Sequence, residues 1–538
     1  MRAWYVASSL IAVAGIAAAS FIACDTSEDC TFSANGCGGG RDAGFDSNPQ
    51  QWPAGCIPAA DPGDSLPCVD ESVALFVAPK DKGGSEGGAG TKTSPISTLR
   101  AALDKVGVRP RIYVCGGNYE EAVTINHRVS IFGGFDCSGG NWTVPKNAPL
   151  ATNIAPSAVG TPALTIQAVS EAITLMDMSF TSKDATAAGG NSIAGWVTQS
   201  SDVTFKRVTF TAGAGKDGDP KDEPKITDPA PAKDGIDADA GAPGGEQPND
   251  CSALKAGNNR SVGAPGGDKG ETGAARGGDG GIGLPQIQPP NPNDNFNGVG
   301  GQGLASGDVC TSVPGARNGS LGVGGAKTPV TGPLGTVAQD GYHGVDGLKG
   351  GDGQTAQGGG GGGGQVGTSG GGGGGAGGCG GQGGAGAQAG GSSIALLVYK
   401  TKVHLFQSKL AAAAPGKGGH GGKGQKGQEG GGGSRPLGGG CGGGPGGHGG
   451  GGAGGNGGAG GSSIGLAYGG DPSAAPEIDG KAVTAEIASQ PGWTTTAPNN
   501  NHGVKGTKGD AVSNGKPGED GNDGPDGIAR AAVILQAQ

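Results

Sequence analysis

The sequence predicts an all-β protein: a β solenoid whose rungs are separated by long glycine-rich insertions. Short β-branched blocks, such as Val203 to Phe210, alternate apolar and polar side chains with a period of two. A Ser-Ile unit recurs at Ser192, Ser393 and Ser463, with variable lengths of chain between the copies. Glycine, 125 of 538 residues, falls at every third position through much of the intervening chain. One supersecondary unit that recurs with variable insertions is typical of a solenoid.

Residues 1–23 are predicted to be an export signal. Met1-Arg2 is followed by an uncharged apolar and small stretch, whose length and short basic start fit a signal peptide better than a permanent span. The ending Phe21-Ile22-Ala23-Cys24 resembles a bacterial lipobox, although Phe21 stands where Leu is usual. The resemblance implies that lipidated Cys24 anchors the protein to a membrane of the cell envelope, at the outer membrane or cell surface. An ordinary cleaved secretory signal and a retained anchor are the alternatives.

Cysteine usage also indicates export to an oxidising compartment. If Cys24 carries lipid, an even number of cysteines remains, as a disulfide-stapled protein requires. The disulfide candidates are Cys30, Cys37, Cys56, Cys68, Cys115, Cys137, Cys251, Cys310, Cys379 and Cys441. The simplest pairing joins neighbours in order along the chain. Cys115 and Cys137 in particular flank two strands that should stack in adjacent rungs. Zinc is not expected, because the chain has no C-x-x-C pair.

A polar, Cys-containing tether, residues 24–73, is expected to precede the first rungs, residues 74–213. A short strand is expected from Ala74, and a helix from Thr98 with Leu99, Ala102 and Leu103 on one face. The further strand-like blocks are residues 111–119, 123–125, 129–135, 163–166, 173–180 and 203–210.

Residues 74–140 resemble the opening of right-handed parallel β-helix domains, pectin-lyase-like in shape, that occur in bacterial surface proteins. The matching segments are Phe76 to Pro79, Pro95 to Leu103, Ile112 to Tyr119 and Val123 to Gly134. The resemblance implies a right-handed parallel β-helix. Enzymes on that scaffold use clustered Asp on successive strands for calcium or for acid–base chemistry. Here Asp177 and Asp202 are the main acids on expected strands.

The remaining rungs are expected at 391–415 and within 462–538, ending in a strand from Ala529. Each Ile of the Ser-Ile unit is expected to point inward. The insertions are 214–390, 416–461 and, inside the C-terminal rungs, the collagen-like tract 503–527. A glycine period of three is the period of polyproline II. Collagen, a packed sheet of polyproline II strands and plain disorder are the alternatives, and the composition resembles that of the PGRS proteins.

Charge and motifs exclude several function classes. The formal net charge of −10 is spread over both signs, so no nucleic-acid partner is expected. The G-x-S-x-G match around Ser463 starts a rung instead of a strand-to-helix turn, so no catalytic residue is assigned. Acids every three residues in the tracts are interpreted as solvated charges. No cofactor or metal site is expected, with calcium as a weak alternative at these acids.

The sequence therefore favours a non-enzymatic, surface-anchored lipoprotein with a structural or adhesive role. Its partners would be the membrane, through the lipid, and an extracellular polysaccharide or another cell-surface molecule. The alternatives are a carbohydrate-active enzyme, lyase or hydrolase, on the same scaffold and a passive coat or matrix component. Fold alone does not decide among them.

Overall fold

The computed structural model describes residues 52–145, 149–221, 229–239, 242–251, 260–269, 300, 302–306, 308–312, 315–436, 438–470, 475–512 and 514–537. The expected export signal, Cys24, Cys30 and Cys37 lie outside the described residues. The chain divides into two units, Met1–Gln51 and Trp52–Gln538, and only the second is described below. In the described part of the chain, no helix is long and apolar enough to cross a membrane.

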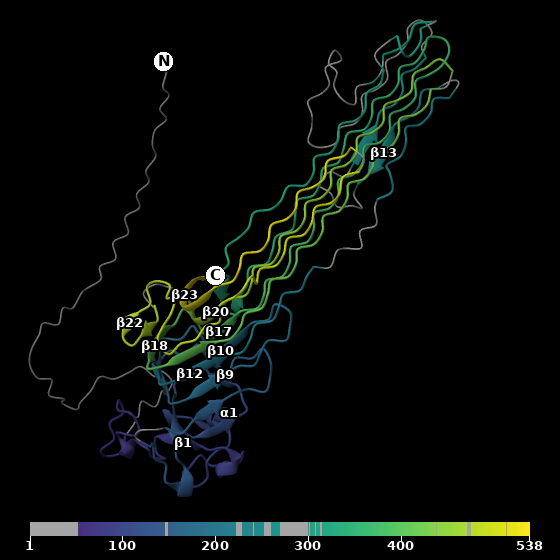
Figure 1. Cartoon of the computed structure of the whole chain (residues 1–538). Coiled ribbons are helices and arrows are strands. Elements are labelled where there is room, and N and C mark those ends of the chain that lie inside the picture. Colours follow the sequence, from purple (N-terminus) through teal and green to yellow (C-terminus); the bar gives the residue numbers. More distant parts are fainter. Residues whose placement is uncertain are drawn as a thin grey trace, which may run out of the picture. The chain divides into compact units, whose positions relative to one another are not determined.

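Three mainly parallel sheets form the solenoid (Figure 1). Sheet A contains β1 (Ala74–Val77), β2 (Arg111–Cys115), β5 (Ser130–Phe135), β8 (Ile173–Met176), β11 (Asp202–Lys206), β18 (Lys402–Phe406), β21 (Glu477–Ile478) and β22 (Lys481–Ala482). Sheet B contains β3 (Gly117–Tyr119), β6 (Thr152–Ile154), β9 (Ser179–Thr181), β12 (Thr209–Ala212) and β19 (Lys409–Ala412). Sheet C contains β4 (Val123–Ile125), β7 (Leu164–Gln167), β10 (Ser192–Thr198), β17 (Ser393–Tyr399), β20 (Ser463–Gly469), β23 (Ala529–Ala537) and the hairpin of β15 (Thr336–Ala338) and β16 (Gly341–His343). The chain passes through sheets A, B and C in turn, which confirms the expected all-β solenoid.

One end of the solenoid is closed by the helix α1 (Leu99–Lys105). The Thr98 hydroxyl caps it by accepting a hydrogen bond from Ala101 N, and the Glu121 carboxylate accepts from the first two helical N–H groups. Leu99, Ala102 and Leu103 are buried against the first rungs, as the helical pattern predicted.

In the rungs from β7 to β12 and from β17 to β19, two corners are tight turns that contain a single left-handed residue. Between sheets A and B these residues include Asp177, Arg207 and Gln407, with φ of 56°, 53° and 49°. Between sheets C and A they include Ala168, Gln199 and Lys400. Because the corners repeat, residues at equivalent positions stack from rung to rung.

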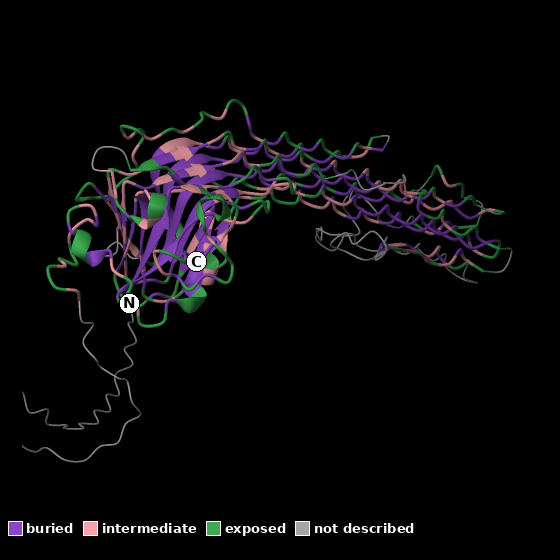
Figure 2. Ribbon diagram, turned by 90° about the horizontal axis from the view of Figure 1, so that it is seen from below, coloured by how far each residue is buried: buried purple, intermediate pink, exposed green. Residues whose placement is uncertain are grey.

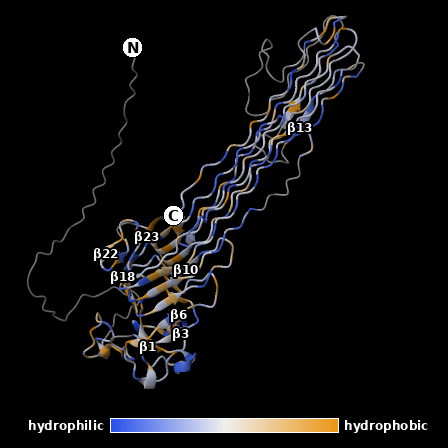
Figure 3. Ribbon diagram, in the orientation of Figure 1, coloured by the Kyte–Doolittle hydropathy of each residue, from blue (hydrophilic) through white to orange (hydrophobic). Residues whose placement is uncertain are grey.

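All the long insertions leave from the third corner, between sheets B and C. The chain leaves after β12, β19 and Thr494, and returns at β17, β20 and β23 respectively. The rungs carry the apolar side chains and the insertions are mostly pale or hydrophilic (Figure 3).

The Ser-Ile units stack as predicted, but their Ile side chains do not face the solenoid interior. The register pairs Ile193 with Ile394, and Ile394 with Ile464. Ile394 and Ile464 are fully buried in a second cluster on the outer face of sheet C, whereas Ala395 and Leu396 belong to the interior core. The expectation that each Ile points inward is therefore wrong. The reason is that the β15–β16 hairpin, which comes from the first insertion, covers this outer face.

The described parts of the insertions pack side by side as the glycine bundle (Figures 1 and 2). Its tracts are 214–221 with 229–236, 242–251 with 260–269, 315–326, 344–364, 370–391, 413–434, 441–461, 501–512 and 514–527. Hydrogen bonds toward any one neighbour recur at every third residue, which is the period of polyproline II. The described tracts are therefore a packed polyproline II-like assembly and not disordered chain.

The central tract, 441–461, is enclosed by six others. Its N–H groups donate in turn to tracts 344–364, 413–434 and 514–527. Its carbonyls accept from tracts 315–326, 370–391 and 501–512. All three residues of each polyproline II turn thus face the backbone of a neighbouring tract. A Cβ at Gly449, for example, would overlap the carbonyl of Cys379, which explains why glycine dominates.

Four disulfides join the described cysteines. Cys56–Cys68 and Cys115–Cys137 have the pairing expected from chain order, with Cα–Cα distances of 4.6 and 5.6 Å. The expected in-order pairing is wrong for the last four, because the structure joins Cys251 to Cys379 and Cys310 to Cys441. The bundle brings together tracts that are more than a hundred residues apart in the chain, so sequence order does not decide the partners.

Candidate functional site

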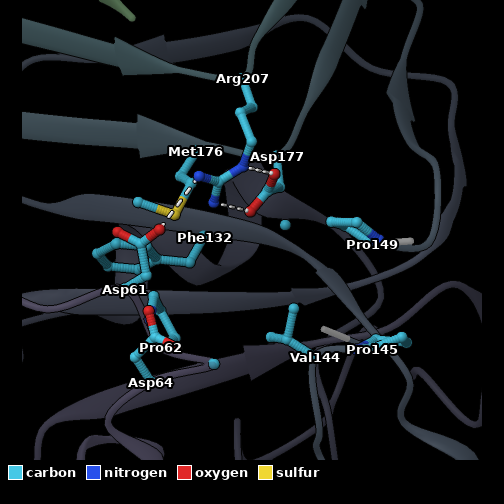
Figure 4. Close-up of a pocket in the computed structure, with 12 residues that line it drawn as sticks. Asp61, Pro62, Asp64, Phe132, Val144, Pro145, Pro149, Met176, Asp177 and Arg207 are labelled. Atoms are coloured by element: carbon cyan, nitrogen blue, oxygen red, sulfur yellow. Dashed lines mark hydrogen bonds and ion pairs between the residues drawn. The ribbon is translucent and has the colours of Figure 1, made fainter. Parts of the chain in front are cut away.

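A cavity of about 450 Å³ lies at the corner between sheets A and B (Figure 4). Its lining includes Phe132 and Met176 from sheet A, the corner residues Asp177 and Arg207, and the segment 61–64. A second cavity of about 480 Å³, on the sheet B side, shares Pro149, Asp177 and Arg207 with the first. The two cavities thus form adjoining chambers, here called the corner groove.

Arg207 organises the charges between the two chambers. Its Nε and Nη2 donate to the two carboxylate oxygens of Asp177 at 2.7 and 2.8 Å, and its Nη1 donates to Asp61 at 3.1 Å. Lys206 Nζ donates to the other oxygen of Asp61 at 2.6 Å. Two acids and two bases therefore form a closed network, visible in part in Figure 4. Bidentate Arg–carboxylate pairs of this kind fix geometry as well as charge.

The network favours the charged forms of Asp61 and Arg207. Burial alone raises the pKa of Asp61, but hydrogen bonds from Lys206 and Arg207 outweigh it and hold that pKa below its ordinary value. The hydrogen bond to Asp177 raises the pKa of Arg207. Asp61 is therefore ionised at neutral pH and is poorly suited to donate a proton.

The first chamber is walled by the disulfide-closed segment 52–68, here called the strap. Arg111 fixes the strap to sheet A, since its guanidinium lies 4.8 Å from the Trp52 ring and 5.0 Å from the Phe132 ring. The Tyr113 hydroxyl donates to the carbonyl of Cys68 at 2.7 Å. Sequence reasoning placed the strap in a polar tether and gave no signal that it contacts sheet A.

Polar side chains follow the floor of the second chamber from rung to rung. The register aligns Asn153 with Ser179, Ser179 with Thr209, and Thr209 with Lys409 on adjacent strands of sheet B. Gln407 lies beside them at the next A–B corner. A row of one polar group per rung thus faces the chamber.

The two acids assigned to strands lie apart. Asp177 is in the corner groove, whereas Asp202 is on β11 beside His404, with Oδ1 3.3 Å from Nε2. The Glu477 carboxylate oxygen Oε2 accepts a hydrogen bond from the other ring nitrogen of His404, Nδ1, at 2.9 Å. The structure therefore does not bring Asp177 and Asp202 together into the Asp cluster that β-helix enzymes use.

The acids of the tracts act as backbone acceptors, a role that sequence reasoning missed. Asp520, Asp523 and Asp526 accept hydrogen bonds from the backbone N–H groups of residues 508, 505 and 502 of the neighbouring tract. Further acceptors of the same kind are Asp217, Asp234, Asp237, Asp346 and Asp352. At the edge of the bundle, N–H groups without a neighbouring carbonyl recur at every third residue of a tract. The acids have the same three-residue spacing because they accept from these groups. The described residues contain no group of three or more ligands arranged for a metal ion.

The repeated Ser residues hold the base of the insertions. Ser463 Oγ donates to the carbonyl of Ala412 at 3.2 Å and accepts from Thr496 N at 2.9 Å. Ser393 Oγ makes the equivalent bonds to Gly213 O and Ala413 N. Both are fully buried, which fits a structural rung position better than a nucleophile.

Comparisons with known proteins do not add an assignment. No protein-family model, no curated protein and no solved structure matches this chain. The geometry and chemistry of the chain itself are therefore the basis for a function.

Proposed function

We propose that this protein is an exported surface lipoprotein with a structural or adhesive role. The proposal combines a pectin-lyase-like β-helix, PGRS-like glycine tracts and a lipid anchor at Cys24. Its partners are the membrane, through the lipid, and extracellular polysaccharide or another cell-surface molecule.

The observation that carries the proposal is the enclosed tract 441–461. At the ~3.1 Å rise per residue of polyproline II, its 21 residues span about 65 Å. A chain of this length that is hydrogen-bonded to neighbouring tracts throughout makes a stiff element, and the described charged side chains of the bundle are exposed or half-buried. A stiff element with a solvated surface suits a load-bearing or presenting role and serves no evident catalytic need.

A carbohydrate-active enzyme is the second candidate, and the corner groove is the observation that favours it. Asp61 and Asp177 both line the first chamber. However, both oxygens of Asp177 accept from Arg207, and those of Asp61 accept from Lys206 and Arg207. Neither carboxylate is poised as an acid or a nucleophile. Incubation with polysaccharides, followed by product analysis, tests this candidate: cleavage that Asp177→Asn abolishes would replace the adhesive proposal.

The adhesive proposal is tested by pull-down with the mature protein. Purified extracellular polysaccharides and cell-wall fractions are immobilised, and retention of the protein is measured. Specific retention supports adhesion, whereas absence of retention from every fraction favours the passive coat or matrix component.

Anchoring is tested separately by mass spectrometry of the mature N-terminus. Acylated Cys24 is the expected result, and Cys24→Ser should release the protein from the membrane fraction. An unmodified peptide that spans Ala23 and Cys24 would refute the lipid anchor while leaving adhesion open.

A further inference from the structure

The second chamber of the corner groove offers side chains that are not engaged within the described chain. Ser179, Thr209, Gln407 and Lys409 line it, and their side chains make no hydrogen bond or ion pair to the described residues. Gln407 and Lys409 are exposed, and Ser179 and Thr209 are half-buried. Donors and acceptors that point into a concave surface without partners are available to a ligand.

These polar groups are spaced by the rungs of the solenoid. Asn153, Ser179, Thr209 and Lys409 occupy one register position on four adjacent strands. Adjacent strands lie about 4.8 Å apart, so the row offers one polar group at each step of about 4.8 Å. A ligand that uses the whole row must run along the solenoid axis and carry polar groups at a similar interval. A linear chain of sugar rings has this character, with hydroxyl groups on every ring.

The walls of the groove supply the apolar complement. Pro149 lines both chambers, and Phe132, Met176 and Pro62 line the first. Sugar rings present C–H faces as well as hydroxyl groups, so a groove with a polar floor and apolar walls suits them. A peptide strand is a poorer fit, because the floor is the face of sheet B and its edge strand β19 is already hydrogen-bonded to Thr494 through Leu410 and Ala412.

The charges give the groove a direction. The network of Asp61, Asp177, Lys206 and Arg207 holds two charges of each sign and is internally matched. Lys409 is then the unmatched cation of the second chamber, whereas Asp64, at the first chamber, is an exposed acid. An anionic group is favoured only at the Lys409 end.

We propose that the corner groove binds a linear oligosaccharide that carries an acidic substituent. The sugar chain lies along the solenoid axis over Ser179 and Thr209, and its acidic group pairs with Lys409. This inference rests on the proposed adhesive function and assigns it a site and a ligand class. The site is at the A–B corner, so the insertions, which leave from the B–C corner, are free for another role.

The test uses the full mature chain and an array of linear oligosaccharides of two to eight sugars, neutral and uronate-bearing. Affinities of the retained sugars are measured by calorimetry. Thr209→Trp fills the second chamber and should weaken binding at least tenfold. Thr211→Trp, two residues along the same strand and outside both chambers, is the matched control and should bind as the wild type does. Circular dichroism and thermal unfolding establish that both variants are folded.

Lys409→Glu tests the acidic substituent. It should weaken binding of uronate-bearing sugars at least tenfold, remove most of the salt dependence and leave neutral sugars unaffected. Lys481→Glu, the same charge change on β22, should alter neither.

The outcomes separate this inference from the proposed function. If sugars bind and Thr209→Trp binds them equally well, the groove assignment is overturned and adhesion stands. If no sugar of the array binds but a cell-wall fraction is retained in a Thr209-dependent way, the ligand class is overturned. If neither the array nor any cell-wall fraction is bound, both the inference and the adhesive function fail.

Discussion

Replacement of Gly449 by Ala tests whether the glycine bundle is a packed element. Gly449 lies in the enclosed tract 441–461, where its N–H donates to the carbonyl of Gln428 at 2.9 Å. A Cβ here would overlap the carbonyl oxygen of Cys379 and lie 3.0 Å from that of Gly378. These obstacles are backbone atoms that no side-chain rotation can remove, so the tract itself must shift.

The expected cost follows from the bonds that flank this position. A shift of the tract away from residues 370–391 strains the bonds from Gly378 N to Gly447 O and from Gly381 N to Gly450 O. Each contributes about 1 kcal/mol net, and overpacking a close-packed site costs about 1–3 kcal/mol. Gly449→Ala should therefore lower the free energy of unfolding by about 2–4 kcal/mol.

The measurement is denaturant unfolding together with amide hydrogen exchange. The matched control is Gly332→Ala, because a Cβ at the exposed Gly332 meets no atom within 4 Å. It should change stability by less than about 0.5 kcal/mol. Gly449→Ala should also speed exchange of the N–H groups in tracts 370–391 and 441–461. Equal unfolding midpoints and equal exchange for the two variants would refute the packing argument.

Three further predictions concern the strap, the edge of the bundle and a disulfide. Asp61 has a depressed pKa in the folded protein, so its contribution to stability is present above the unfolded pKa of about 3.9 and is lost as pH falls through the folded pKa. Protection of the strap against hydrogen exchange should therefore drop at acid pH in the wild type but not in Asp61→Asn. An identical pH profile for the two proteins would contradict this. Asp523→Ala leaves an edge N–H without its acceptor and should cost about 1 kcal/mol, whereas Asp523→Asn should restore most of it; equal stability of the two variants would argue against the acceptor role. Loss of the Cys251–Cys379 bridge in the double Ser variant should cost about 4–5 kcal/mol in the chain-entropy model, and an unchanged unfolding midpoint would show that the tracts hold without it.

Much of the solenoid could be predicted from local patterns. The period-two blocks around Phe205 became strands, and the Ser-Ile units stack in register, because a repeated unit encodes its own neighbour contacts. The Cys115–Cys137 pair followed from two strands close in sequence. In each case the interaction joins nearby segments or copies of one motif.

The groove and the bundle partners could not be predicted in this way. Asp61 and Arg207 are 146 residues apart, and neither lies in a repeated motif. The partners of Cys251 and Cys310 depend on which tract packs beside which, and glycine-rich tracts all carry the same period of three. Ile394 is buried on the outer face of sheet C in a cluster that includes Val337 and Tyr342, from a hairpin of a distant insertion. Side-chain patterns identify elements, whereas backbone-mediated packing leaves little trace in the sequence.

The connections of the bundle imply that it and the solenoid form one cooperative structure. Tract 441–461 has open donors until tract 514–527, near the C-terminus, is in place. That tract leads into β23, whose residues Gln536 and Ala537 pair with Thr336 and Val337 of the first insertion. The first insertion therefore covers the last strand, and the last insertion completes the enclosure of the central tract. Because the first and the last insertion each complete contacts that involve the other, the solenoid and the bundle should unfold together. Ile394→Ala in sheet C and Gly449→Ala in the bundle should therefore lower the midpoint of one shared unfolding transition. Two separate transitions, each moved by one variant, would show instead that the bundle is an independent appendage of the solenoid.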